Sequence, residues 1–265
     1  MLELYHSDLS VCSQKVRLVL EEKQLQWIGH RLDLRGRDGG DQFKPEYLKL
    51  NPRAQVPTLV HDGRPIREST LINEYLDGIG PSAALIHGDR FTQYQIRLWA
   101  KIPDDGLHTA CADITYVSSI RKLLKEKGPQ DLERQLTGSP DPAKQDRLRQ
   151  AYELGADAPM IRYAVHLYNR TLSEMELTLE ASPWLVGARF SMADAALTPY
   201  VFRLEMLGME QMLADTPNVQ RWLAAIKERE SFEKGVLQFI QPEIKEVWLS
   251  SGRAVWPQIK SRYFQ

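Results

Sequence analysis

Cysteine is scarce in this sequence, which holds two, Cys12 and Cys111, among 265 residues. No Cys-x-x-Cys and no His-x-x-x-His pattern occurs, so we expect no metal site. One disulfide bridge is conceivable, but no pattern indicates it. A reducing cytoplasm is therefore the simplest expected location.

Long apolar runs and a strong charge of one sign are also missing. No stretch reaches the roughly 18 apolar residues of a transmembrane helix, and the first residues lack the regions of a signal peptide, so we expect no membrane span. The formal net charge of −1 argues against nucleic acid as a partner, because binding it needs a basic face. With 43% hydrophobic residues, the chain is long enough for two domains with real cores.

A β-hairpin is the clearest local prediction. Pro57 suits the first residue of a strand because it donates no N–H, and apolar residues 58–60 follow it. Asp62-Gly63 is a turn signal, so we predict a hairpin over residues 57–67. Only about 5–6% of bonds before proline are cis, so the sequence alone does not predict a cis bond here.

Glu68 and Ser69 follow the hairpin and precede a helix. The apolar residues of this helix fall on one face: Leu71, Ile72, Tyr75, Leu76 and Ile79. A helix N-terminus favours a bound anion, and Ser69 can add a hydroxyl donor. From periodicity alone, the favoured alternative is that Glu68 or Ser69 only caps its own helix.

The order of expected elements is β-α-β-α-β-β-α and then helices alone. The ranges are strand 2–5, helix 11–23, strand 27–32, short helix 43–50, the hairpin, and the helix that begins at 68–69. We predict an α/β domain of thioredoxin-like type over residues 1–79, a linker over 80–85, and an all-helical domain over 86–265. Gly106 marks an expected bend. Residues 126–150 are polar and rich in proline and charge, which predicts a partly disordered insertion.

Ser10 and Cys12 are the candidates for chemistry, because they follow the first strand and open the first helix. A thiolate at a helix N-terminus is stabilised by roughly 0.3–1 kcal/mol, and a hydroxyl donor adds a charge-assisted hydrogen bond. The alternative role of Ser10 is that of a helix cap alone. Cys12 is either a thiolate of low pKa suited to a reductase-type reaction or a small buried hydrophobe.

The hairpin motif resembles the glutathione-binding half of the glutathione transferase superfamily. In Gln55-Val56-Pro57 followed by Glu68-Ser69, the resemblance implies a cis bond at Pro57 and a Val56 backbone that pairs with the cysteinyl part of glutathione. Glu68 and Ser69 would hold the γ-glutamyl end.

The second half of the chain carries a further likeness. The stretch from Trp184 to Asp194 resembles the helix-capping signature of the family's helical domain, which implies a structural role for Asp194.

Residues 10–17, Ser-Val-Cys-Ser-Gln-Lys-Val-Arg, are similar to the zeta-class motif, although that class has serine where this chain has Val11. This likeness implies that Ser10 activates the thiol, with Cys12 and Ser13 nearby. It also implies that Gln42 and Gln55 contact the peptide.

Other parts of the chain resemble other members of the superfamily. Asp104 and His108 fall where the family binds its second substrate, with a solvated helix face as the alternative. Some families use a tyrosine at the position of Tyr5, which here is expected to pack in the sheet. Residues 4–6 and 13–19 also resemble the ganglioside-induced differentiation-associated type, which likewise carries an insertion. The Asn51-Pro52-Arg53 stretch resembles bacterial β-etherases.

The resemblance implies a cytoplasmic homodimer that uses glutathione, without a metal, against a small hydrophobic electrophile. Conjugation, dehalogenation, ether cleavage and isomerisation stay open as reactions, with detoxification as a role. The alternatives are a non-catalytic binding protein on the same fold and a thiol reductase that depends on Cys12.

Overall fold

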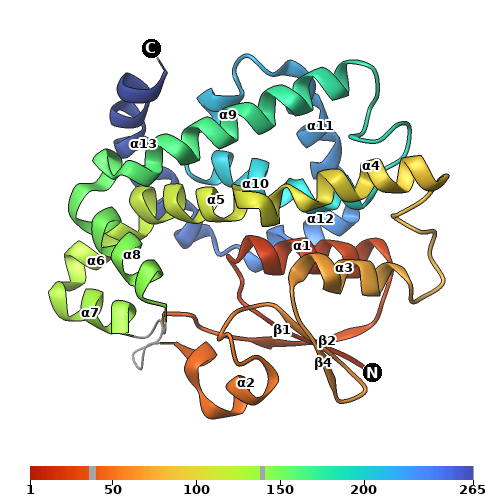
Figure 1. Cartoon of the computed structure of the whole chain (residues 1–265), viewed down its shortest axis with the longest axis horizontal. Coiled ribbons are helices and arrows are strands. Elements are labelled where there is room, and N and C mark those ends of the chain that lie inside the picture. The colour runs from red at the N-terminus through yellow and green to blue at the C-terminus, as the bar shows by residue number, and fades with distance from the viewer. Residues whose placement is uncertain (36–39, 138–140, 265) are drawn as a thin grey trace.

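The computed structural model describes residues 1–35, 40–137 and 141–264, and the predicted order β-α-β-α-β-β-α followed by helices is confirmed (Figure 1). The four strands are β1 Leu2–His6, β2 Trp27–Arg31, β3 Thr58–His61 and β4 Arg64–Ile66. They form one sheet in the order β2-β1-β3-β4. β1 is parallel to β2 and antiparallel to β3.

Three helices pack on the sheet. They are α1 Val11–Glu22, α2 Pro45–Leu50 and α3 Ser69–Asp77. Figure 1 shows α1 and α3 between the sheet and the helical domain, with α2 on the other side of the sheet. Tyr5 packs in the sheet as expected, stacked on His30 with ring centroids 4.4 Å apart.

Residues 78–89 lead from α3 into the helical domain. Its longer helices are α4 Arg90–Lys101, α5 His108–Thr115, α6 Arg121–Lys127, α7 Pro129–Thr137, α8 Pro142–Leu154, α9 Pro159–Glu180, α10 Met192–Met206, α11 Pro217–Lys227, α12 Glu230–Gly235 and α13 Pro242–Tyr263. Helices α10 and α12 pack on α1, so the core is continuous between the two domains. No described helix combines the length and apolar character that crossing a bilayer requires.

The long helical segment bends at Gly106, as predicted. Two wide π turns, η2 Pro103–Leu107 and η3 Tyr116–Ile120, flank α5. Gly106 has φ 136°, a conformation that side chains with a Cβ rarely adopt, and this bend sets the direction of α5.

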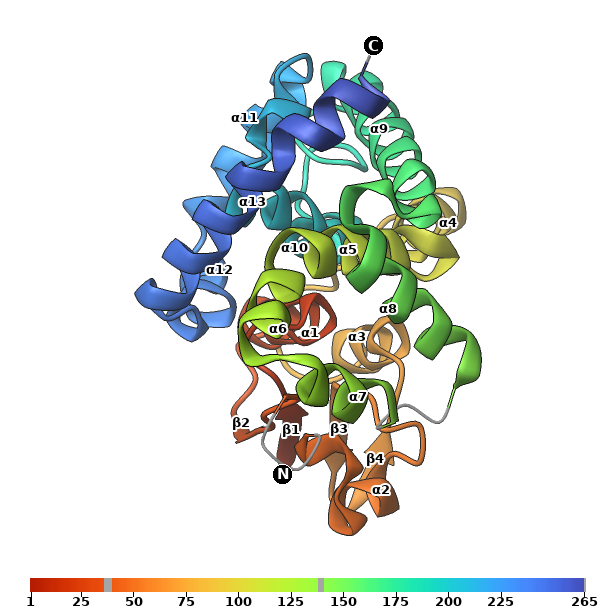
Figure 2. The same cartoon turned by 90° about the vertical axis from the view of Figure 1, so that its left-hand side faces the viewer.

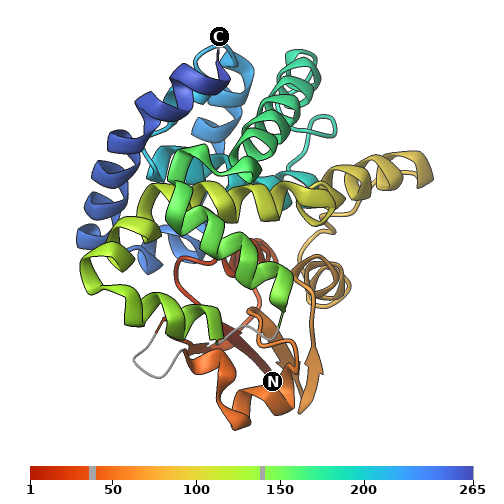
Figure 3. The same ribbon diagram turned by 60° about the vertical axis from the view of Figure 1, so that its left-hand side comes forward.

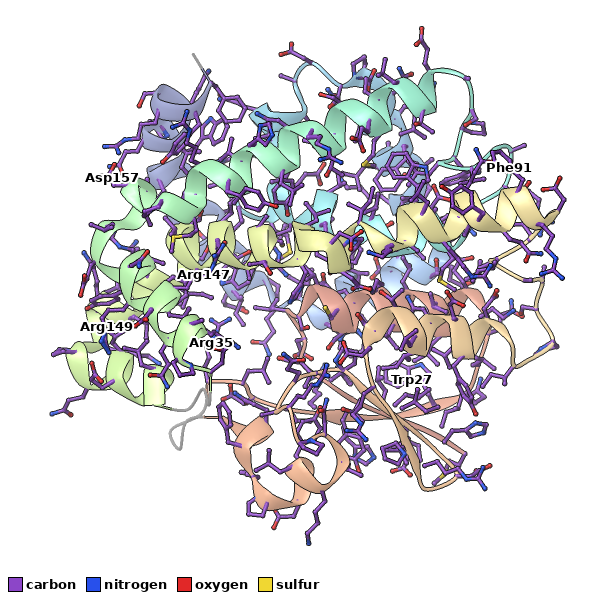
Figure 4. All side chains as sticks on the ribbon, viewed as in Figure 1. Trp27, Arg35, Phe91, Arg147, Arg149 and Asp157 are labelled. Carbon is purple, nitrogen blue, oxygen red and sulfur yellow. The ribbon has the colours of Figure 1, made fainter. Side chains whose placement is uncertain are left out.

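The structure differs from the sequence-based expectation over residues 126–150. This stretch forms helices α7 and α8 instead of a partly disordered insertion, while residues 138–140 lie outside the described part of the chain. The side chain of Asp141 caps α8, and Leu136 is buried. In Figures 3 and 4, α8 lies beside α5, where Arg147 Nε donates to Asp113 Oδ1 at 2.8 Å. Composition alone did not predict these helices, because the residues that stabilise them lie elsewhere in the sequence.

The residues near the C-terminus form α13. This helix runs along the outer side of the helical domain (Figure 2). Gly252 allows its backbone to reach that of Leu207, since a Cβ at Gly252 would lie 1.9 Å from the Leu207 carbonyl oxygen.

The predicted capping box at the start of α10 is present. The buried Asp194 carboxylate accepts hydrogen bonds from the Ser191 N–H at 2.9 Å, the Leu185 N–H at 3.0 Å and Trp222 Nε1 at 2.8 Å. One carboxylate therefore joins a loop, the start of α10 and α11.

We expect Asp194→Ala to destabilise the protein, because it leaves several buried N–H donors without an acceptor. Each unsatisfied donor costs about 1–3 kcal/mol of unfolding free energy. Urea unfolding should show a clear loss of unfolding free energy. The matched control is Asp215→Ala, which removes an exposed carboxylate and should change little. Equal midpoints for the two variants would contradict the structural role of Asp194.

Candidate active site

Two serine hydroxyls form hydrogen bonds with the backbone at the start of α1. Ser10 is the N-cap of α1, and its Oγ accepts a hydrogen bond from the Ser13 N–H at 3.3 Å. The Ser13 hydroxyl, which is buried, accepts in turn from the Ser7 N–H. Among the described residues, no acceptor pairs with the N–H groups of Val11 and Cys12. Two free donors and the helix dipole therefore point at the space in front of α1.

Two buried arginines fix the loop that leads into α1. Arg17 donates to the carbonyl oxygens of Ser7 and Asp8 at 3.3 and 2.9 Å, and also to that of Gly235 in α12 at 2.8 Å. Arg203 of α10 donates to the carbonyl oxygen of Leu9. The loop is thus held by both domains at once.

Cys12 meets a histidine and a tyrosine from the helical domain. Its Sγ lies 3.5 Å from His108 Nδ1 at the start of α5 and 3.7 Å from the Tyr200 hydroxyl of α10. Cys12 is half-buried and His108 is exposed, so solvent reaches the pair. The sequence analysis assigned His108 to the second substrate, which stays a prediction; in the structure its ring contacts Cys12.

Electrostatics favour a thiolate at Cys12. Burial would raise the pKa of this thiol, but the charge and hydrogen bond of His108, with smaller effects of Lys15 and Ser69, outweigh it and lower the pKa to about 6. The Cys12 charge in turn raises the pKa of His108. The pair therefore tends toward thiolate and imidazolium near neutral pH.

Lys15 is a buried cation that the sequence analysis missed. Its ammonium donates to the Thr70 hydroxyl at 2.8 Å, which links α1 to the start of α3. Burial lowers its pKa, against the charges of Cys12, Asp104 and Glu68. The spacing from Cys12 to Lys15 puts both on one face of α1 and is a signal that could have identified it.

The residues before the hairpin present an unpaired backbone. The Val56–Pro57 peptide bond is cis, as the resemblance implied. The carbonyl oxygen of Gln55 accepts from the Tyr47 hydroxyl and from Asn51 Nδ2, which fixes the turn. Within the described part of the chain, the N–H and C=O of Val56 make no hydrogen bond, and the side chain of Gln55 is exposed.

Glu68 and Ser69 stand at the start of α3 as predicted. Glu68 has φ 66° and makes no side-chain cap; its carboxylate pairs with Arg53 at 2.7 Å instead. Ser69 is buried beside Cys12, and no described acceptor pairs with its N–H or that of Thr70. The two helix N-termini therefore face a common region.

Two further candidates are Gln42 and Asp104, whose predicted roles stay predictions. Gln42 is buried and donates to the Leu34 carbonyl oxygen at 3.2 Å, and its own Oε1 has no partner among the described residues. Asp104 is exposed in η2, where its charge acts on Lys15 and His108. Within the described residues, no three histidine, cysteine or acidic side chains are grouped as a metal would require.

Two known domain families match parts of this sequence. The N-terminal domain of glutathione S-transferases matches residues 9–79, and their C-terminal domain matches residues 164–225, together about half of the chain. The chain belongs to the glutathione S-transferase family.

Individual relatives of this glutathione S-transferase cover most of its length. It is 28% identical to glutathione S-transferase TCHQD of Arabidopsis thaliana over 88% of each chain. It is 27% identical to the tetrachloro-p-hydroquinone reductive dehalogenase of Sphingobium chlorophenolicum, over 87% of this chain and 93% of that one. The crystal structure of the β-etherase LigF from a Sphingobium species superposes with a TM-score of 0.78 at 25% identity, over 88% of this chain and 98% of that one.

The contact between Cys12 and His108 predicts a pH dependence of alkylation. Iodoacetamide should modify Cys12 with a midpoint near the pKa of about 6, since the thiolate is the reactive form. His108→Gln removes the stabilising charge and should move the midpoint upward, toward the ordinary cysteine value of about 8.5. Peptide mapping by mass spectrometry across the pH range measures this.

Two controls accompany the alkylation. Cys111 is buried, which raises its pKa, and it should stay unmodified in the folded protein. His166→Gln, at an exposed position of α9, should leave the Cys12 midpoint unchanged. An identical midpoint in His108→Gln and the wild type would show that His108 does not tune the thiol.

Proposed function

We propose that this family member is a glutathione transferase that holds the thiol of glutathione ionised at the start of α1. The observation that carries the proposal is a set of groups left without partners among the described residues: the N–H groups at the starts of α1 and α3, the hydroxyl proton of Ser10, and the backbone of Val56. The tripeptide would add to Val56 as a strand adds to a sheet edge, with its γ-glutamyl carboxylate at the start of α3.

Ser10 is the proposed activator of the thiol. Its oxygen already accepts from the Ser13 N–H, so its own proton is the group that can be donated to a sulfur anion. The thiolate then attacks a small electrophile, and positioning the two reactants supplies most of the catalysis. Relatives named as a β-etherase and a reductive dehalogenase support this nucleophile without selecting one electrophile.

A second candidate function rests on the Cys12–His108 contact. A Cys12 thiolate can attack the sulfur of a glutathionylated thiol, forming a mixed disulfide with glutathione and releasing the other thiol as its thiolate. A second glutathione thiolate then attacks the mixed disulfide, which releases oxidised glutathione and restores Cys12. This reductase-type reaction needs Cys12 and not Ser10.

Ser10→Ala and Cys12→Ala separate the two candidates. A hydrogen bond to a charged group contributes roughly 1.5–3 kcal/mol, so Ser10→Ala should raise the pKa of bound glutathione by about one to two units. Near neutral pH, turnover of a model electrophile should fall about ten- to a hundredfold, with a much smaller effect for Cys12→Ala.

Binding is measured separately by calorimetry. Glutathione affinity should change little in either variant, because Val56, Glu68 and Ser69 hold the peptide. If Ser10→Ala lowers turnover only slightly and Cys12→Ala abolishes it, the serine mechanism is wrong and the reductase reaction is the better proposal. No heat of binding to the wild type at millimolar glutathione would favour the non-catalytic alternative.

We also propose that the protein is a homodimer through α3 and α4. Phe91, Tyr94 and Leu98 lie on one face of α4 and are 66%, 55% and 52% exposed, and Phe91 projects at the outer end of the helix (Figure 4). On α3, Leu71 and Tyr75 are also exposed. Arg97 of α4 pairs with Glu74 of α3 at 3.3 Å, so the two apolar faces adjoin. A patch of this kind suits a two-fold contact between copies.

Sedimentation of Leu98→Glu tests the dimer. The wild type should sediment at twice the chain mass of 30.4 kDa, and the variant should shift toward 30.4 kDa because a charge is buried in the contact. Leu177→Glu is the matched control, since Leu177 is 71% exposed on α9, outside this patch. A wild-type protein of 30.4 kDa at micromolar concentration would contradict the dimer.

A further inference from the structure

A break in the long helical segment places His108. The π turn η2 ends at Leu107, and His108 is the first residue of α5. Gly106 has φ 136° inside that turn, so the bend that sets the direction of α5 also directs His108. Such turns are rare and are frequent at functional sites. The ring thereby reaches from the helical domain to the start of α1, where the glutathione sulfur is proposed to bind.

The two ring nitrogens of His108 have different surroundings. Nδ1 lies 3.5 Å from Cys12 Sγ and 3.4 Å from the Tyr200 hydroxyl oxygen. Nε2 makes no hydrogen bond to a described residue, and the side chain is exposed. One nitrogen is therefore held by the protein, while the other is free to meet a ligand. This is the arrangement that a histidine needs for transferring a proton to a substrate.

The groups that face His108 favour its charged form. The Cys12 charge raises the pKa of His108 most, partial burial and the Lys15 charge lower it, and the Asp104 charge raises it further. The result is a pKa above the ordinary histidine value. Tyr200 stays neutral, because burial raises its pKa well above the ordinary tyrosine value. In the imidazolium, Nδ1–H donates to the Cys12 thiolate, and Nε2–H remains as an acid.

An acid at this place matters only for some electrophiles. When a thiolate attacks an ether, the group that leaves is an oxygen anion. Phenol, the conjugate acid of a phenoxide, has a pKa of about 10, as the tyrosine side chain does. A positioned acid with a pKa near neutral pH can protonate such an oxygen as the bond breaks, which contributes typically 10²–10⁴-fold in rate. A chloride ion needs no such proton.

We propose that His108 is the general acid of this site and that the enzyme acts on activated ethers, with Nε2–H directed at the ether oxygen that leaves. The inference rests on the proposed function, because the nucleophile is the glutathione thiolate at Ser10. It adds a catalytic residue from the helical domain and selects a class of electrophile.

The step balances without an oxidant or a reductant. The glutathione sulfur forms a bond to carbon, and the bond from that carbon to the ether oxygen breaks. The electron pair of the broken bond stays on oxygen, which takes the proton of His108 Nε2 and leaves as an alcohol or a phenol. The neutral ring keeps its Nδ1 proton toward Cys12 and regains the Nε2 proton from solvent. The Cys12 charge favours this return.

Two ethers that differ in the leaving group test the role of His108. In 2-phenoxyacetophenone the leaving group is a phenoxide, and in 2-(4-nitrophenoxy)acetophenone it is a much weaker base. His108→Gln should lower cleavage of the phenoxy compound about a hundredfold or more. It should lower cleavage of the nitrophenoxy compound much less, since that oxygen leaves without a proton. His166→Gln, at an exposed position of α9, is the matched control and should cleave both at the wild-type rate.

The pH dependence gives a second readout, which a purely structural role would not change. With 2-phenoxyacetophenone, the wild-type rate should rise as glutathione ionises and fall as His108 loses its proton at higher pH. The fall should be absent in His108→Gln. In Cys12→Ala it should move to lower pH, because the charge that raises the His108 pKa is gone. A fall that persists in His108→Gln would overturn the proposal.

The remaining outcomes are distinguishable. Equal losses with the two ethers, or no loss with either, would overturn the role of His108. A wild type that transfers glutathione to 1-chloro-2,4-dinitrobenzene but cleaves neither ether would overturn this inference alone. No transfer to any of the three compounds would contradict the proposed function, and this inference with it.

Discussion

Two buried guanidinium groups hold the loop before α1, and the candidate site depends on them. Arg17 and Arg203 donate to the carbonyl oxygens of residues 7–9. Arg17 also donates to Gly235 of the helical domain, and Arg203 itself belongs to that domain. Burial lowers the pKa of Arg17 to about 9, which leaves it charged near neutral pH. Burial and the charge of Arg17 lower the pKa of His6 to about 3, so its neutral ring can accept from Arg17 at 3.0 Å. The planar fork of donors suits this task, which a lysine could not perform.

The same arrangement makes the region in front of α1 positive. The N-termini of α1 and α3, the buried ammonium of Lys15 and the imidazole of His108 all favour a negative sulfur atom. Two sulfur anions close together would repel each other, so a Cys12 thiolate and a glutathione thiolate compete for one field. Pairing with His108 reduces this competition, because it neutralises the charge of Cys12 locally. In the proposed serine mechanism, His108 therefore limits the repulsion between Cys12 and the glutathione sulfur, and Cys12 itself is not needed for turnover.

Predictions from the sequence were accurate where the deciding interactions are local. The strands, the hairpin, the bend at Gly106 and the capping box at Asp194 each depend on residues a few positions apart. The cis bond at Pro57 came from the resemblance and not from propensity, because most such bonds are trans.

The sequence alone could not predict contacts between residues that are far apart along the chain. Tyr200 lies 188 residues from Cys12, and Arg203 lies 194 residues from Leu9, so no spacing brings them together in advance. The prediction of partial disorder over residues 126–150 missed a contact of this kind. Arg147 of α8 pairs with Asp113 of α5, and no local pattern indicates that pair.

A crystal structure of the protein with glutathione tests the account most directly. The account predicts the glutathione sulfur at the start of α1, within hydrogen-bond distance of Ser10 Oγ. The cysteinyl backbone should pair with Val56, and the γ-glutamyl carboxylate should lie at Ser69. Glutathione bound elsewhere, or a sulfur directed away from Ser10 and joined to Cys12 as a disulfide, would contradict it.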